Sequence, residues 1–143
     1  MLSNTTGTVF LIPLILFAGC ASSQENTTIP EEYANTVEIT PATGQQSGPS
    51  VIYVDSAAVI QRDDRHSLLV MGYFPDGCTH IGNARHTVTD KTISLDLNAW
   101  RNPQQMCTQA LVAFSFIYSD LPESRLQQAS SVTINGTNFE LGH

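Results

Sequence analysis

The side chains best suited to metal or acid–base chemistry lie in one part of the chain. They are three histidines and three aspartates: His66, His80 and His86, with Asp63, Asp64 and Asp76. Imidazole and carboxylate groups bind divalent metals, and Cys78, two residues before His80, offers a thiolate. Their spacing matches no zinc-binding pattern, and a thiolate ligand would have to be a free cysteine. We therefore interpret the histidines as exposed loop residues and expect no metal and no other cofactor; a metal site at Cys78 and His80 is the alternative.

No catalytic arrangement stands out among these residues or the serines. The chain lacks the Gly-x-Ser-x-Gly turn that presents the nucleophile of many hydrolases. Asp63 and Asp64 are adjacent, so in an extended chain their side chains point apart, whereas the paired carboxylates of glycosidases flank one bond. We predict that the protein is not an enzyme, with a hydrolytic domain as an alternative.

The first twenty residues have the composition of an export signal. Residues 9–18 are apolar, which is about half of the ~20 residues that a membrane-spanning helix requires. An apolar region of this length followed by small residues is typical of a signal peptide. The sequence Leu16-Phe17-Ala18-Gly19-Cys20 resembles the lipobox of bacterial lipoproteins. This resemblance implies that residues 1–19 are a lipoprotein signal peptide and that Cys20 carries acyl chains such as palmitate; an ordinary signal peptide cut nearby is the alternative.

Lipidation at Cys20 would place the protein outside the cytoplasm, anchored to the bacterial cell envelope. If the host has two membranes, Ala21 gives no inner-membrane retention signal of the aspartate kind, which favours the outer membrane. In an oxidising compartment Cys78 and Cys107 form an even pair, and neither belongs to a Cys-x-x-Cys motif. We predict a disulfide between them. Because both cysteines border turns, this bond should lie at an edge of the domain.

A change of composition divides the exported chain into two parts. Residues 20–50 are rich in Ser, Thr, Gln, Pro, Gly and Glu. So few apolar side chains bury too little surface to offset the entropy of ordering, which predicts a disordered tether. Residues 51–143 are long enough for one domain with a modest core.

The overall charge excludes one class of partner. The chain carries 13 acidic and 6 basic residues, a formal net charge of −7. A protein that binds nucleic acid needs a basic surface, so we expect no nucleic-acid partner. The chain also lacks the polybasic cluster that would hold a protein on anionic lipid.

The domain contains short alternating or apolar runs separated by turns. Between Ser67 and Phe74, apolar residues stand at both odd and even positions, which predicts a central strand covered on both faces. In residues 92–97 aliphatic and polar residues alternate, which places them on opposite faces of a strand. Residues 110–118 form a second candidate central strand. Asn135-Gly136, between two alternating runs, predicts a hairpin with Val132 and Ile134 facing the core.

These features predict an all-β fold of about seven short strands, one disulfide and little helix. That pattern favours an antiparallel β-sandwich of the immunoglobulin-like type, with a small open barrel as the alternative. The strands alone do not decide between the two.

The motifs also carry a resemblance. Residues 72–79, Gly-Tyr-Phe-Pro-Asp-Gly-Cys-Thr, followed by Met106-Cys107 and a closing strand at Asn135-Gly136, resemble an uncharacterised β-sandwich domain of bacterial exported proteins and lipoproteins. The resemblance covers residues 51–141 and implies that the Pro-Asp-Gly-Cys-Thr turn and the later cysteine frame the sandwich. This chain differs after Leu121-Pro122, where residues 125–130 replace the usual Gly-x-Tyr. No activity is implied.

Two classes of function remain open on the sequence. The first is a membrane-anchored module that binds an envelope protein or a glycan through its loops or an exposed sheet face. The second is a purely structural envelope lipoprotein. An exposed apolar patch would favour binding, and the residues to inspect are Tyr53, Tyr73, Phe74 and Trp100.

Overall fold

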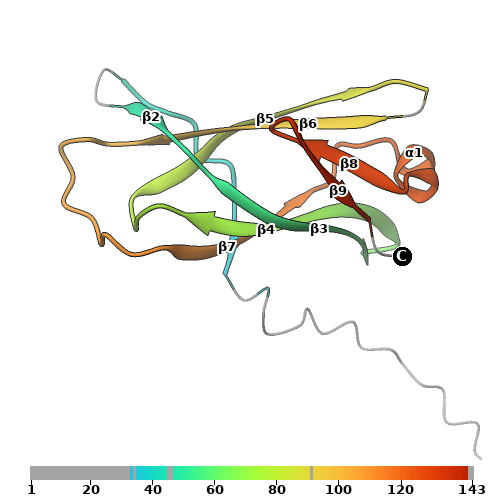
Figure 1. Cartoon of the computed structure of the whole chain (residues 1–143), viewed down its shortest axis with the longest axis horizontal. Helices are drawn as coiled ribbons and strands as arrows, with labels where there is room; N and C mark the ends of the chain where they lie inside the picture. The colour runs from blue at the N-terminus through green and yellow to red at the C-terminus, as the bar shows by residue number, and fades with distance from the viewer. Residues whose placement is uncertain (1–32, 34, 45–46, 91, 142–143) are drawn as a thin grey trace, which may run out of the picture.

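The computed structural model describes residues 33, 35–44, 47–90 and 92–141 (Figure 1). The predicted signal peptide 1–19 and lipidation at Cys20 lie outside the described residues. The elements are β1 (Thr36–Val37), β2 (Gly48–Ser50), β3 (Tyr53–Arg62), β4 (Arg65–Phe74), β5 (Thr79–Val88), β6 (Ile93–Arg101), β7 (Val112–Tyr118), α1 (Glu123–Gln128), β8 (Ser131–Ile134) and β9 (Thr137–Glu140). Within the described part of the chain, no helix has both the length and the hydropathy needed to cross a bilayer.

Two sheets pack face to face, which confirms the predicted β-sandwich. The first sheet has the strand order β1-β7-β4-β3. In the second sheet β6 pairs with β5 on one side and with β2 and β8 on the other, and β9 pairs with β8. The seven longer strands, β3 to β9, match the expected number. The second sheet differs in order from an immunoglobulin constant domain, because β6 pairs in parallel with β8.

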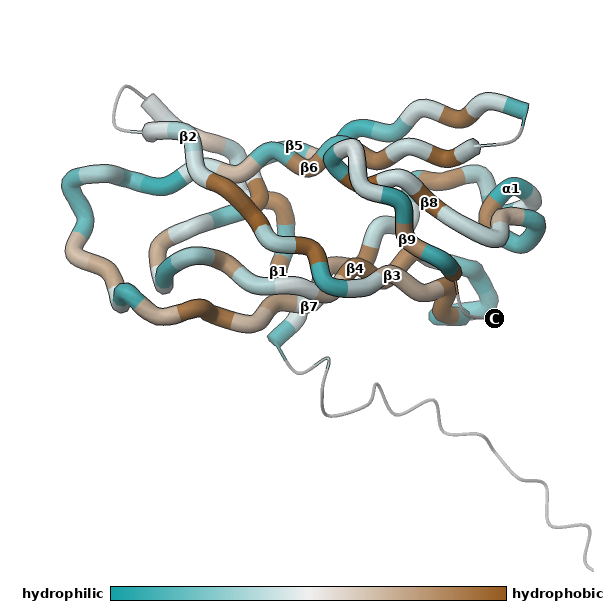
Figure 2. The backbone as a smooth tube through the Cα atoms, in the orientation of Figure 1, coloured by the Kyte–Doolittle hydropathy of each residue, from teal (hydrophilic) through white to brown (hydrophobic). Residues whose placement is uncertain are grey.

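The core lies between the sheets and follows the alternation in the sequence. Along β6 the aliphatic residues Ile93, Leu95 and Leu97 are buried, while Asp96 between them is exposed. Hydrophobic and polar residues alternate in the same way along the longer strands in Figure 2. β8 contributes Val132 and Ile134, both buried as predicted. Burial of such side chains stabilises the fold by about 1.5–3 kcal/mol each.

β4 is the central strand that the sequence predicted, but its two faces differ. Its inward residues Leu68, Val70 and Phe74 belong to the core. On the outer face Leu69 is also fully buried, whereas Tyr73 is 41% exposed. The outer face of this strand is therefore covered near its start and open to solvent near its end.

Two short strands lie inside residues 20–50, the segment that the sequence predicts as a disordered tether. β1 pairs with β7 and β2 pairs with β6, so the sandwich begins before residue 51. Between these strands Thr40 N donates to Ile81 O at 2.8 Å, and Trp100 Nε1 donates to Thr40 O at 2.6 Å. The prediction failed because strands of two and three residues are too short to give a periodic pattern, and their hydrogen bonds are made to residues far along the chain.

The Asn135-Gly136 hairpin forms as predicted. Both residues have positive φ, 48° and 82°, as a type I′ turn requires. The Asn135 side chain also holds the turn against β6, because its Oδ1 accepts from Leu97 N at 2.7 Å and its Nδ2 donates to Leu97 O at 3.1 Å.

The segment before this hairpin contains the one helix of the described chain. After Leu121-Pro122 the chain forms α1, where a turn was expected. Leu126 is the fully buried residue of this helix, so α1 closes one end of the sandwich with a single aliphatic side chain.

Candidate functional site

The disulfide marks the opposite end of the molecule, which we call the disulfide end. Cys78 and Cys107 are bonded, with their α-carbons 5.5 Å apart. The bond joins the turn between β4 and β5 to the long loop that precedes β7. It lies at an edge of the sandwich, which confirms both the predicted pairing and its predicted position.

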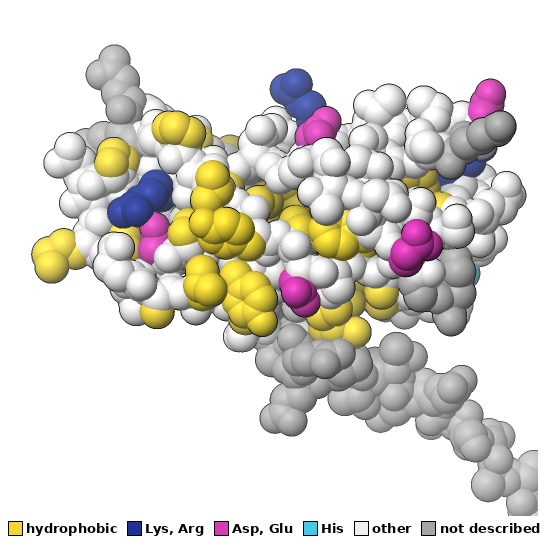
Figure 3. All heavy atoms as spheres, in the orientation of Figure 1, with side chains coloured by type: hydrophobic (Ala, Val, Ile, Leu, Met, Phe, Trp, Pro, Cys, Tyr) yellow, Lys and Arg dark blue, Asp and Glu magenta, His cyan; other side chains and the backbone are white. Residues whose placement is uncertain are grey.

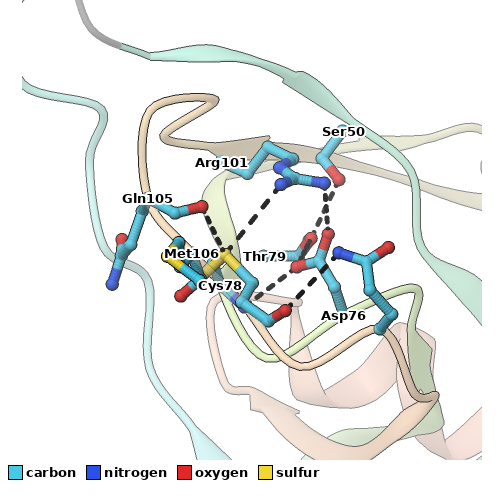
Figure 4. A network of polar contacts seen from close by, with 9 residues as sticks. Ser50, Asp76, Cys78, Thr79, Arg101, Gln105 and Met106 are labelled. Carbon is cyan, nitrogen blue, oxygen red and sulfur yellow. Dashed lines mark hydrogen bonds and ion pairs between the residues drawn. A yellow bond between two sulfur atoms is a disulfide. The ribbon is translucent and has the colours of Figure 1, made fainter.

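A buried carboxylate organises the turn beside the disulfide (Figure 4). The Oδ1 atom of Asp76 accepts hydrogen bonds from Cys78 N at 2.9 Å and from Thr79 Oγ1 at 3.0 Å. Its Oδ2 atom accepts from Arg101 Nη1 at 2.6 Å. Thr79 Oγ1 is in turn hydrogen-bonded to Ser50 Oγ at 2.9 Å. Asp76 thus connects the β4–β5 turn to β6 and, through Thr79, to β2.

The environment of Asp76 favours its charged form. Burial raises the pKa of this carboxyl, but the hydrogen bonds from Cys78 and Thr79 and the Arg101 guanidinium outweigh it, so the pKa is lowered. Arg101 also places Nη2 3.9 Å from Cys107 Sγ. The ion pair and the disulfide therefore join the same turn to two neighbouring parts of the chain, the end of β6 and the loop that follows it. Both carboxylate oxygens of Asp76 accept from neighbouring protein groups and the side chain is only 3% exposed, so we interpret the arrangement as structural.

The three histidines lie apart. His66 Nδ1 is hydrogen-bonded to Glu123 Oε1 at 2.8 Å, His80 lies against Trp100 with ring centroids 5.0 Å apart, and His86 Nδ1 is hydrogen-bonded to the Tyr118 hydroxyl at 2.7 Å. Among the described residues no three His, Cys, Asp or Glu side chains are placed to share a metal ion. Cys78 is in the disulfide, so the alternative of a thiolate ligand beside His80 is not supported.

Of the four aromatic residues named from the sequence, two form an exposed pair. Phe74 is buried and stacks on Phe114, with ring centroids 4.4 Å apart. Trp100 is half-buried, and its Nε1 donates a hydrogen bond to the Thr40 carbonyl oxygen. Tyr53 and Tyr73 are 53% and 41% exposed and are direct cross-strand neighbours on β3 and β4.

These tyrosines continue into a flat row across the first sheet. Tyr73 pairs with Ala113 of β7, and Ala113 is also exposed. The neighbouring strands β3, β4 and β7 therefore present Tyr53, Tyr73 and Ala113 side by side. We call this row the tyrosine face. Figure 3 shows hydrophobic side chains gathered over the first half of β3 and the region beside it.

A bulge in β3 creates the tyrosine face. The register between β3 and β4 shifts between Val54 and Ser56. The bulge adds one residue to β3, so the residues before it face the opposite way from what simple alternation predicts. Tyr53 therefore points outward, although Ala57, an even number of residues later, is in the core. Gly72 fits here because a methyl group on it would overlap the carbonyl oxygen of Tyr53.

Fold and site together define a small disulfide-linked β-sandwich module with an exposed aromatic row. Comparison with known families then places it: residues 68–141 match the model of the ORF11 beta-sandwich domain, and the chain belongs to that family. The match begins in β4 and ends after β9, so β1 to β3 lie before it. No curated protein and no solved structure matches the chain.

The family match supports a β-sandwich domain, as the sequence resemblance implied. The other parts of that resemblance, to bacterial lipoproteins and to a domain defined by the Pro-Asp-Gly-Cys-Thr turn, remain predictions. The Asp76–Arg101 ion pair was not predicted. Its only sequence signs are an aspartate inside a turn and an isolated base at the end of an alternating strand.

Proposed function

We propose that this protein is a bacterial envelope lipoprotein, anchored through acyl chains on Cys20, whose β-sandwich is a non-catalytic binding module. The lipobox-like sequence that ends at Cys20 supports the anchor, with the outer membrane as the site in a host with two membranes. The exposed pair Tyr53 and Tyr73 carries the proposal of binding. Tyrosine is enriched at interfaces, and here two tyrosines lie side by side on neighbouring strands with about half of each side chain exposed.

The partner class that best fits the tyrosine face is an envelope protein, with a glycan as the second candidate. The surroundings favour a protein, because Val51, two residues before Tyr53, adds an aliphatic side chain that is 54% exposed. Aliphatic groups gain most from burial against other apolar groups. Recognition of a glycan by a tyrosine platform would also need hydrogen-bonding side chains along its rim.

Site-specific photo-crosslinking in intact cells tests the contact. A photoreactive phenylalanine analogue replaces Tyr73, and a matched control replaces Thr137, an exposed residue of β9 in the other sheet. The proposal expects one discrete cross-linked protein from position 73 that is lost when Tyr53→Asp is added. A product that collapses on glycan digestion identifies a glycan. The absence of any product specific to position 73 would leave the purely structural lipoprotein as the better account.

The anchor is tested separately. Mass spectrometry of the mature N-terminus is expected to show Cys20 as the first residue with added acyl mass, and Cys20→Ser is expected to release the protein from membranes. Cleavage at another bond without acyl mass overturns the anchor and leaves the crosslinking result interpretable on its own.

A further inference from the structure

The loop between β6 and β7 is the most exposed apolar feature of the disulfide end. It spans residues 102–111 and carries Met106, which is 97% exposed, and Leu111, which is 63% exposed. In Figure 1 it extends from the end of the sandwich that holds the start of β2. A methionine so fully exposed has no role in the core, so its placement needs another reason.

The loop is held in this projecting position. Cys107 fixes it to the β4–β5 turn through the disulfide, and next to that bond Gly77 N donates to Thr108 O at 3.1 Å. Closer to β6, Gln105 N donates to Asn102 O at 3.1 Å. The loop is therefore tied to the β4–β5 turn just after Met106 and closed by a turn of its own just before it, which lowers the entropy cost of burying that side chain against a partner.

The charge distribution separates this end from the rest of the molecule. Segments 41–54, 72–84 and 97–119 contain two Asp, Glu, Lys or Arg residues, Asp76 and Arg101. These two neutralise each other at 2.6 Å, with the Asp76 side chain 3% exposed. Six of the seven large hydrophobic residues that are exposed in the described chain lie in the same segments. These segments, which include the disulfide end, thus carry no uncompensated charge and hold most of the exposed large hydrophobic residues.

A bilayer interface is the partner that this distribution fits best. Charged side chains are costly in the low-dielectric part of a membrane, so a membrane-dipping end must lack them, whereas protein interfaces usually keep a polar and charged rim. The missing basic residues point to contact with uncharged lipid headgroups.

We infer that the loop inserts Met106 and Leu111 into the interface of the membrane that carries the anchor. This inference rests on the proposed lipidation of Cys20. Only 15 positions along the chain lead from Cys20 to Asn35, the residue before β1. Even fully extended, they reach about 50 Å at ~3.3–3.6 Å per residue. A domain on so short a connection stays close to the bilayer, so a modest contact through this loop is enough to hold the disulfide end there.

Fluorescence quenching by lipid tests the insertion. Met106→Trp adds a second tryptophan to a chain whose sole tryptophan is Trp100. Gln61→Trp, at an exposed position near the end of β3, is the matched control. The acylated proteins are reconstituted in phosphatidylcholine vesicles with brominated acyl chains. The emission of wild-type protein, which comes from Trp100, is subtracted from that of each variant. We expect the remaining emission to be mostly quenched for the tryptophan at position 106 and to persist for the one at position 61.

A pair of charge variants gives the second readout. With the tryptophan at 106, Leu111→Glu is expected to restore the emission, whereas Gln61→Glu is expected to leave it quenched. Equal emission from positions 106 and 61 in acylated protein overturns the loop contact and leaves the anchor standing; a sample without acyl mass overturns the anchor, and this inference with it. A specific cross-link from position 106 to a protein also overturns the inference, in favour of a protein partner.

Discussion

Asp76 and Arg101 form an ion pair of 2.6 Å between Oδ2 and Nη1, and from the same turn the disulfide reaches the loop that follows β6, where Cys107 Sγ lies 3.9 Å from Arg101 Nη2. One link is electrostatic and the other is covalent. If either is lost, the other still holds the β4–β5 turn near the end of β6. The aspartate is nearly inaccessible, whereas the Arg101 side chain is 30% exposed. The carboxylate therefore depends on its partners more than the guanidinium does.

Asp76→Asn should destabilise the domain by about 2 kcal/mol, less than the 3–5 kcal/mol typical of a fully buried pair, because Arg101 keeps access to water. The matched control is Asp63→Asn, which removes a surface contact of 3.7 Å to Arg62 and should change stability by less than about 1 kcal/mol. Urea unfolding of both variants measures the difference. Equal effects would contradict a special role for the buried pair.

Stability should fall in acid. The pKa of Asp76 is lowered below its ordinary 3.8 by the hydrogen bonds and Arg101 acting against burial. The pKa of Glu123 is lowered below its ordinary 4.5, first by its side-chain hydrogen bond to His66. A lowered pKa means that the unfolded chain binds protons first, so this stability is present above the ordinary values and is lost as pH falls through the folded pKa. Unfolding measured across this range should show a smaller loss in Asp76→Asn than in wild type.

The disulfide closes a segment in which the two cysteines are 29 positions apart. On the chain-entropy model its removal costs up to about 3.6 kcal/mol, a large share of the ~5–15 kcal/mol that stabilises a small domain. Cys78→Ser with Cys107→Ser should lower the free energy of unfolding by several kcal/mol while leaving the far-ultraviolet circular dichroism of a β-protein. Non-reducing peptide mapping of protein taken from its native compartment should find the two cysteines linked; free thiols at both positions would contradict this.

The parts of the fold that could be predicted are those in which one short segment contains its own evidence. The alternation in β6 and the turn at Asn135-Gly136 are of this kind, because side-chain facing and positive φ follow from local residue types. β1, β2 and the Asp76–Arg101 pair could not be predicted, since each depends on a partner distant in the sequence. Helix α1 has one buried side chain, Leu126, too little for a helical period.

That Tyr53 and Tyr73 share one exposed face could not be predicted from the sequence, for a different reason. Simple alternation groups Tyr53 with Ala57 on one face of the strand, and Ala57 is in the core. The bulge between Val54 and Ser56 reverses that assignment. A bulge adds one residue and has no reliable sign in the sequence. The face on which a side chain lies before the bulge therefore cannot be predicted from the alternation after it.

The same geometry gives the last prediction, on Gly72. β3 crosses so close to this residue that a methyl group would overlap the Tyr53 carbonyl oxygen and touch the Phe114 ring, 3.1 Å away. Gly72→Ala should therefore cost about 1–3 kcal/mol, the range for overpacking a well-packed site, and should push the start of β3 away from β4. Since Tyr53 is attached to the displaced backbone, the variant should also weaken any crosslink made from position 73. Gly44→Ala is the control, because nothing lies within 4 Å of its added methyl group, although its φ of 77° adds local strain. It should lower the melting temperature less than Gly72→Ala and leave the crosslink unchanged; a Gly72→Ala protein with wild-type stability and an intact crosslink would show that β3 can move there without loss.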